Sequence, residues 1–258
     1  MVSGRRTIQG MTSVRRALAG RDGLAQIAVV LGAVGAYELA RILIKPDWPA
    51  ALANARKVVR VEQVFGIDWE NWLQQVFLAM PDLVHALNVF YFVGHFLFTG
   101  IFFFWLYHRS RNGFRSFRNG FMIATAISIF VHWAFPTAPP RLAGVGLQDT
   151  LLMFSGIDIG SPSTSALTNP VAAVPSLHAA YALGVGIGLV LYARSHVLRT
   201  AGALYPPLVF VTIVATGNHF ILDAFAGIAV LGIGFVVVVL LNRRRREEEE
   251  RAQEPCYT

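Results

Sequence analysis

The sequence has few charged residues and only one cysteine for a chain of its length. Asp, Glu, Lys and Arg make up 14% of its 258 residues, whereas 55% are hydrophobic, and the mean hydropathy is +0.52. Soluble domains of this size rarely have so little charge, so the composition indicates a membrane protein. The single cysteine, Cys256, excludes an internal disulfide.

Long apolar runs take the place of the missing charge. Six of them approach the ~20 residues that cross a ~30 Å hydrocarbon core. They cover about 24–44, 83–107, 118–136, 176–194, 199–216 and 219–241. Backbone polar groups in lipid must be satisfied internally, and these runs are too long for barrel strands. We therefore predict an all-α fold, a polytopic membrane bundle of about six transmembrane helices, in which Pro206 and Pro207 make the fifth helix the weakest.

The runs divide the chain into three parts. Residues 1–117 hold a basic N-terminal tail, two transmembrane helices and an outer-face amphipathic segment; 118–241 form a four-helix catalytic core; 242–258 are a charged tail. A first apolar run behind basic residues can also be a cleaved secretory signal, but this run is long for one. Glu38 and Arg41 are spaced i and i+3, which favours a retained helix.

Basic residues in the short loops predict the orientation. They cluster before the first run, between the second and third, between the fourth and fifth, and after the sixth, which are all on one side of the predicted bundle. By the positive-inside rule we expect an integral plasma-membrane protein with both termini in the cytoplasm. The net charge of +7 then reflects topology and anionic lipid rather than nucleic acid, because the basic residues form no patch with aromatics.

Two histidines occupy the same relative place in two different runs. His178 follows Pro175 and Ser176, and His219 follows Gly217 and Asn218. Both runs begin at the predicted extracytoplasmic face, and helix starts carry unpaired N–H groups and a positive dipole. Such starts bind anions, and phosphate is the best candidate.

Further donors belong to the same predicted site. A guanidinium such as that of Arg141 can bind phosphate through two hydrogen bonds, although an arginine at a helix end can also simply extend to the interface. We expect the side chains of Ser176 and Asn218, and the amides after Pro175 and Asn218, to donate to the same anion.

The chemistry expected of this site is nucleophilic. Asp223 lies one helical turn after His219, where its carboxylate could fix the imidazole tautomer and leave the other nitrogen as a nucleophile. The same carboxylate could instead cap its own helix. His178 could be a general acid, although a single interfacial histidine is often structural.

Other polar residues lie inside the predicted spans. Tyr91 and His95 are one turn apart in the second run, and we predict that both contribute to the substrate cavity, since ionisable groups in membranes are costly and often functional. For His85 and His132 we expect structural roles.

The motifs resemble those of a known family. Pro175-Ser176-Leu177-His178 resembles the Pro-Ser-x-His motif of the type 2 phosphatidic acid phosphatase superfamily, and His219 with Asp223 resembles the end of its third motif, His-x-x-x-Asp. The resemblance spans about 120–236. The Pro-Thr-Ala-Pro-Pro-Arg run at 136–141 and the lack of the usual arginine before His219 look more like the inositol phosphorylceramide synthase branch.

The resemblance implies a reaction. His219 would attack phosphorus to form a phosphohistidine, Asp223 would orient it, His178 would protonate the leaving alcohol, and Arg141 with Ser176 would hold the phosphoryl oxygens. It implies a lipid phosphate as substrate, with transfer to water or to a polyol such as inositol, and no metal or cofactor.

Other functions remain open from the sequence. His178 and His219 could be the axial ligands of a haem electron carrier. A non-catalytic transporter is possible because a fold does not fix a function. An intramembrane serine protease using Ser176 lacks the expected Ser-x-Gly context, since Leu177 and His178 follow.

Overall fold

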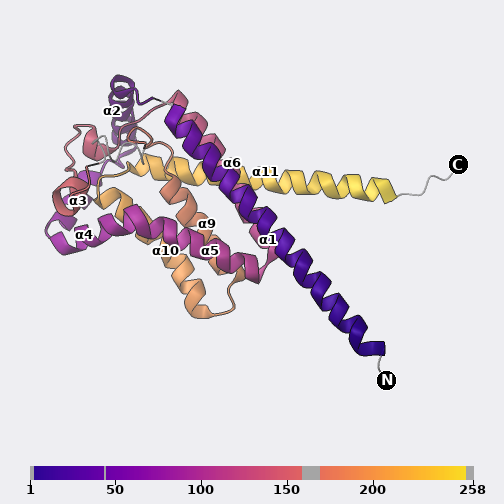
Figure 1. The fold of residues 1–258 in the computed structure, drawn as a ribbon. Helices are drawn as coiled ribbons and strands as arrows, with labels where there is room; N and C mark the ends of the chain where they lie inside the picture. Colours follow the sequence, from indigo (N-terminus) through magenta and orange to yellow (C-terminus); the bar gives the residue numbers. More distant parts are fainter. Residues whose placement is uncertain (1–2, 44, 159–168, 254–258) are drawn as a thin grey trace. The chain divides into compact units, whose positions relative to one another are not determined.

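The computed structural model describes residues 3–43, 45–158 and 169–253 (Figure 1). It divides into two compact units at Leu43. Most of the described residues are helical, and they contain no strand beyond one isolated β-bridge. The prediction of an all-α fold is confirmed. Cys256 lies outside the described residues.

The first unit is one long helix, α1, Ser3–Leu43. Its part Asp22–Ile42 is long and apolar enough to cross a membrane. Arg41 and Glu38 form the i,i+3 ion pair expected from their spacing, with 2.6 Å between Nη2 and the carboxylate oxygen.

The second unit begins with two amphipathic helices, α2 (Trp48–Phe65) and α3 (Glu70–Leu78). The Asp47 side chain caps α2 by accepting from the Ala50 N–H at 3.0 Å, and Gly66 ends the helix in the left-handed conformation. These helices correspond to the predicted outer-face segment.

A continuous helical rod follows. It consists of α4 (Pro81–Val89), a single π-helical turn η1 (Phe90–Gly94) and α5 (His95–Arg109). Single π turns inside α-helices insert one extra residue and are frequent at functional sites.

The remaining helices complete the bundle. They are α6 (Arg111–Ala134), α9 (Leu177–Tyr192), α10 (His196–Ala215) and α11 (Ile221–Gln253). Helix α9 packs against α5, α6, α10 and α11, so it is central (Figure 1). Pro206 and Pro207 lie inside α10 without ending it.

Over its described residues each of the six predicted runs lies largely in helix, and four helical stretches in the described part of the chain meet the length and hydropathy of a membrane span. They are Asp22–Ile42, Pro81–Arg109, His196–Ala215 and Ile221–Ala252. Helix α9 is apolar but has only 16 residues. Helix α6 has 24 residues, but its first turns are rich in arginine, asparagine and glycine, which lowers their hydropathy.

The described parts of the long connection between α6 and α9 are hydrogen-bonded to the rest of the bundle. It contains the 3₁₀ turn η2 (Pro140–Leu142) and the short helix α7 (Thr150–Ser155). The side-chain amide of Gln74, on α3, makes two hydrogen bonds to the backbone of Gln148. It accepts from the Gln148 N–H at 2.8 Å and donates to the Gln148 carbonyl at 3.1 Å. The part of the connection around Gln148 is therefore fixed against α3, and Arg141 bonds through its backbone to Gly217 just before α11.

Candidate active site

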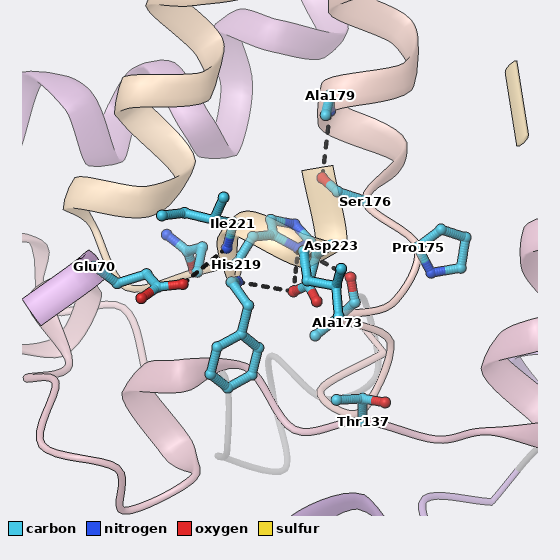
Figure 2. Close-up of polar contacts among 12 residues, drawn as sticks. Glu70, Thr137, Ala173, Pro175, Ser176, Ala179, His219, Ile221 and Asp223 are labelled. Carbon is cyan, nitrogen blue, oxygen red and sulfur yellow. Dashed lines mark hydrogen bonds and ion pairs between the residues drawn. The ribbon is translucent and has the colours of Figure 1, made fainter. Parts of the chain in front are cut away.

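Ser176 joins the start of α9 to α11 (Figure 2). Its Oγ caps α9 by accepting from the Ala179 N–H at 3.3 Å, and its own N–H donates to the Asp223 carbonyl at 2.9 Å. The side chain is fully buried. Capping uses only a lone pair, so the hydroxyl hydrogen remains available to a ligand.

The His219 ring is oriented by two oxygen atoms. Its Nδ1 lies 3.0 Å from the Ala173 carbonyl and 3.3 Å from Asp223 Oδ2 (Figure 2). Both neighbours are acceptors, so we infer that Nδ1 carries the proton and Nε2 carries the lone pair. Asp223 Oδ2 also accepts from the Phe220 N–H at 2.9 Å, so the carboxylate both faces His219 and caps its own helix.

His178 lies beside His219, with ring centroids 5.7 Å apart. Tyr91 stacks on the His178 ring at 4.3 Å between centroids. The Nε2 atom of His178 is buried and has no hydrogen-bond partner among the described residues. A buried polar atom without a partner costs about 1–3 kcal/mol, which makes this nitrogen a candidate to meet a ligand.

The π turn η1 brings two residues to the same place. It contains Tyr91, and His95 follows it directly, with a ring centroid 4.7 Å from that of His178. His95 Nδ1 lies 3.2 Å from the Tyr205 hydroxyl of α10, and its Nε2 is buried without a partner among the residues described. The two polar residues predicted in the second span therefore do lie against His178.

Arg141 is hydrogen-bonded to two loops, the one before α11 and the one before α7. Its Nε donates to Asn218 Oδ1 at 2.9 Å and its Nη1 to Asp149 Oδ2 at 2.8 Å, while its backbone N–H donates to the Gly217 carbonyl at 3.0 Å. Its partner Asn218 directly precedes His219 in the chain, which holds the guanidinium beside the start of α11. Guanidinium has five N–H donors, so these bonds leave others for an anion.

Both ends of the Asn218 amide group are hydrogen-bonded within the protein. Its Oδ1 accepts from Arg141, and its Nδ2 donates to Thr216 Oγ1 at 2.7 Å. The Nδ2 atom carries a second hydrogen, so the prediction that this side chain donates to phosphate stays a prediction.

The expectation that the backbone amides at the start of α11 are free to bind an anion is wrong. The amides there are already bonded: His219 N–H donates to the Ile213 carbonyl, Phe220 N–H to Asp223, Ile221 N–H to Glu70 and Leu222 N–H to Glu62. Carboxylates are favoured at helix starts for the same reason as phosphates, and here they occupy the position. The amide after Pro175 is also bonded, to the Asp223 carbonyl, so an anion here would rely on the arginine and the Ser176 hydroxyl.

Two further histidines have local partners. His132 Nε2 lies 3.2 Å from the Pro175 carbonyl, and His85 Nδ1 lies 2.8 Å from the Phe154 carbonyl. These contacts agree with structural roles. Among the described residues, no three His, Cys, Asp or Glu side chains form a group that could hold a metal ion.

Sequence reasoning missed several contributors. Glu62 lies on the buried stripe of α2 with Ala51, Ala55 and Val58, at helical spacing. A carboxylate on an apolar stripe is a signal that the sequence does contain. The Ala173 carbonyl and the Tyr205 hydroxyl carried no such signal, because their contacts depend on tertiary packing.

Comparison with models of known protein families identifies a family for this chain. The family model of the PAP2 superfamily matches residues 56–237, from inside α2 to inside α11, which is well over half of the chain. No curated protein and no solved structure matches.

Proposed function

Because the chain belongs to the PAP2 superfamily, we propose that it cleaves the phosphoester of a lipid phosphate through a phosphohistidine on His219. Membership supports phosphatase or phosphotransferase activity on lipid phosphoesters in general. The observation that carries the finer proposal is the setting of His219, whose Nδ1 faces the Ala173 carbonyl and Asp223 and whose neighbour is His178.

The proposed reaction has two proton-balanced steps. In the first, His219 Nε2 forms a bond to phosphorus, the bond to the leaving alcohol breaks, and a proton on His178 passes to the leaving oxygen. In the second, His178 takes the proton of an acceptor hydroxyl, that oxygen bonds to phosphorus, and the bond to His219 breaks. Arg141 and the Ser176 hydroxyl bind the phosphoryl oxygens in both steps. No step in this scheme uses a metal ion.

The acceptor in this proposal is an alcohol of the inositol type, with water as the competitor. His95 and His178 each have a buried ring nitrogen without a partner among the residues described. A hydroxyl both donates and accepts, so one hydroxyl or a neighbouring pair could satisfy these nitrogens whichever tautomers they adopt. Water offers the same donor and acceptor, so the preference for a polyol rests on the sequence resemblance to the inositol phosphorylceramide synthase branch.

We further propose that the site faces the extracytoplasmic side of the plasma membrane. Helices α9 and α11 both begin at the site, and basic residues follow the opposite end of each: Arg194 after α9, and Arg243 to Arg246 within the last part of α11. The positive-inside rule assigns those ends to the cytoplasm.

The test uses the purified chain in detergent with labelled phosphatidylinositol, phosphatidic acid or polyprenyl phosphate, with and without inositol. We expect His219→Ala to abolish turnover and phosphoenzyme formation, and His196→Ala, an exposed histidine at the start of α10, to leave both unchanged. Inositol-dependent product would identify transfer. Turnover that survives His219→Ala would refute the phosphohistidine.

A further inference from the structure

Two buried carboxyl groups from the outer segment hold the first turn of α11. Glu62 Oε1 accepts from the Leu222 N–H at 2.7 Å, and Glu70 Oε1 accepts from the Ile221 N–H at 2.9 Å (Figure 2 shows Glu70). The two glutamates are 1% and 4% exposed. Helices α2 and α3 thus reach a point 160 and 151 residues away in the chain.

These bonds act directly next to His219. Together with the bond from the Phe220 N–H to Asp223, they engage three consecutive amides that follow the histidine. The backbone after His219 is therefore fixed from three helices, α2, α3 and α11 itself. The direction of the imidazole depends on this backbone.

The two carboxyl groups cannot both be ionised without cost. Glu62 Oε2 is buried and has no donor among the described residues. Burial, and then the nearby Glu70 and Asp223 carboxyls, raise the pKa of Glu62 to about 9, although the Leu222 N–H opposes this. A proton on Glu62 Oε2 would turn this oxygen into a donor to Glu70 and would remove the repulsion.

We propose that Glu62 and Glu70 form a carboxyl pair that shares one proton and positions His219 by holding the first turn of α11. The role is positioning, since neither glutamate would touch the substrate. As a contribution to catalysis, it rests on the function proposed above.

Variants of Glu62 separate positioning from simple packing. Glu62→Gln keeps the acceptor for the Leu222 N–H and a donor toward Glu70, so it imitates the protonated acid. Glu62→Ala removes both. We expect Glu62→Ala to lower kcat about 10- to 100-fold with KM unchanged, as for a small misplacement of a reacting group, and Glu62→Gln to restore kcat to within about threefold. Asp68→Asn, an exposed acid between the two helices, is the matched control.

The pH dependence tests the shared proton. We expect kcat of the wild type to fall as the pH rises through about 9, where Glu62 ionises, and Glu62→Gln to lack this fall. A wild-type kcat in Glu62→Ala, or the same alkaline loss in Glu62→Gln, would overturn the proposal.

Thermal unfolding gives a readout that does not need activity. Because the pKa of Glu62 in the folded chain is raised from 4.5 to about 9, the folded state binds the extra proton in this window, and stability falls as the pH rises through it. The Tm of the wild type should therefore fall more between pH 6 and pH 10 than that of Glu62→Gln. Identical Tm profiles would overturn the shared proton, whereas activity in His219→Ala would overturn only the reaction.

Discussion

Replacing Asp223 by Asn measures how much of the orientation of His219 depends on the carboxylate. The imidazole Nδ1 has two acceptors, and the Ala173 carbonyl at 3.0 Å is closer than Asp223 Oδ2 at 3.3 Å. In Asp223→Asn the carbonyl remains, so the tautomer with a free Nε2 should persist. The charge that would stabilise a developing imidazolium is lost.

The expected loss follows from the strength of one hydrogen bond. Bonds to a charged group contribute about 1.5–3 kcal/mol, which corresponds to a decrease in kcat of about 10- to 150-fold. His219→Ala should lose all phosphoenzyme, a far larger effect. Asp223→Asn should still form phosphoenzyme, at a slower rate.

Rapid-quench measurement of the labelled phosphoenzyme and steady-state kcat together test this reasoning. If Asp223→Asn is as inactive as His219→Ala, the Ala173 carbonyl does not orient the ring. If Asp223→Asn has the kcat of the wild type, the carboxylate serves only as a cap for the Phe220 N–H.

Three other predictions have defined outcomes. Lysine has no planar fork of donors, so Arg141→Lys cannot keep both the Asn218 and Asp149 contacts, and kcat/KM should fall about 10- to 100-fold. Lys57→Arg, on α2, is the control in the same assay. In Gly227→Ala the new Cβ would collide with the Ser176 carbonyl, whereas a Cβ at Gly232 of the same helix meets nothing within 4 Å. Gly227→Ala should therefore lower both Tm and kcat, and Gly232→Ala neither; equal Tm values would show that α9 and α11 can separate freely. The purified chain should show no Soret band, and a Soret band lost in His178→Ala would support a haem carrier instead.

The helices were predictable because membrane spans depend on local composition. The fourth run was expected at 176–194 and α9 covers Leu177–Tyr192; the sixth was expected from 219 and α11 begins at Ile221. Pro206 and Pro207 predicted the fifth helix to be the weakest, and α10 continues through both of them.

The part of the site that could be predicted is the part that lies close in sequence. His219 and Asp223 are one turn apart, and their contact follows from helical geometry. The bonds from Glu62 and Glu70 to α11 join residues more than 150 positions apart, so only the folded chain reveals them. The amides of α11 were expected to be free because a sequence does not show which distant carboxylate reaches a helix start.

The parallel bridge between the two ends of the long connection should make the site insensitive to the thickness of the bilayer. Thr137 N–H donates to the Val171 carbonyl at 2.8 Å and Ala173 N–H donates to the Thr137 carbonyl at 3.1 Å, while the Ala173 carbonyl meets His219. Arg141 follows Thr137 by four residues and is bonded through its backbone to Gly217. The spacing between imidazole and guanidinium is therefore set by peptide-to-peptide bonds outside the spans, and a change of helix tilt in a thicker or thinner bilayer should leave it intact.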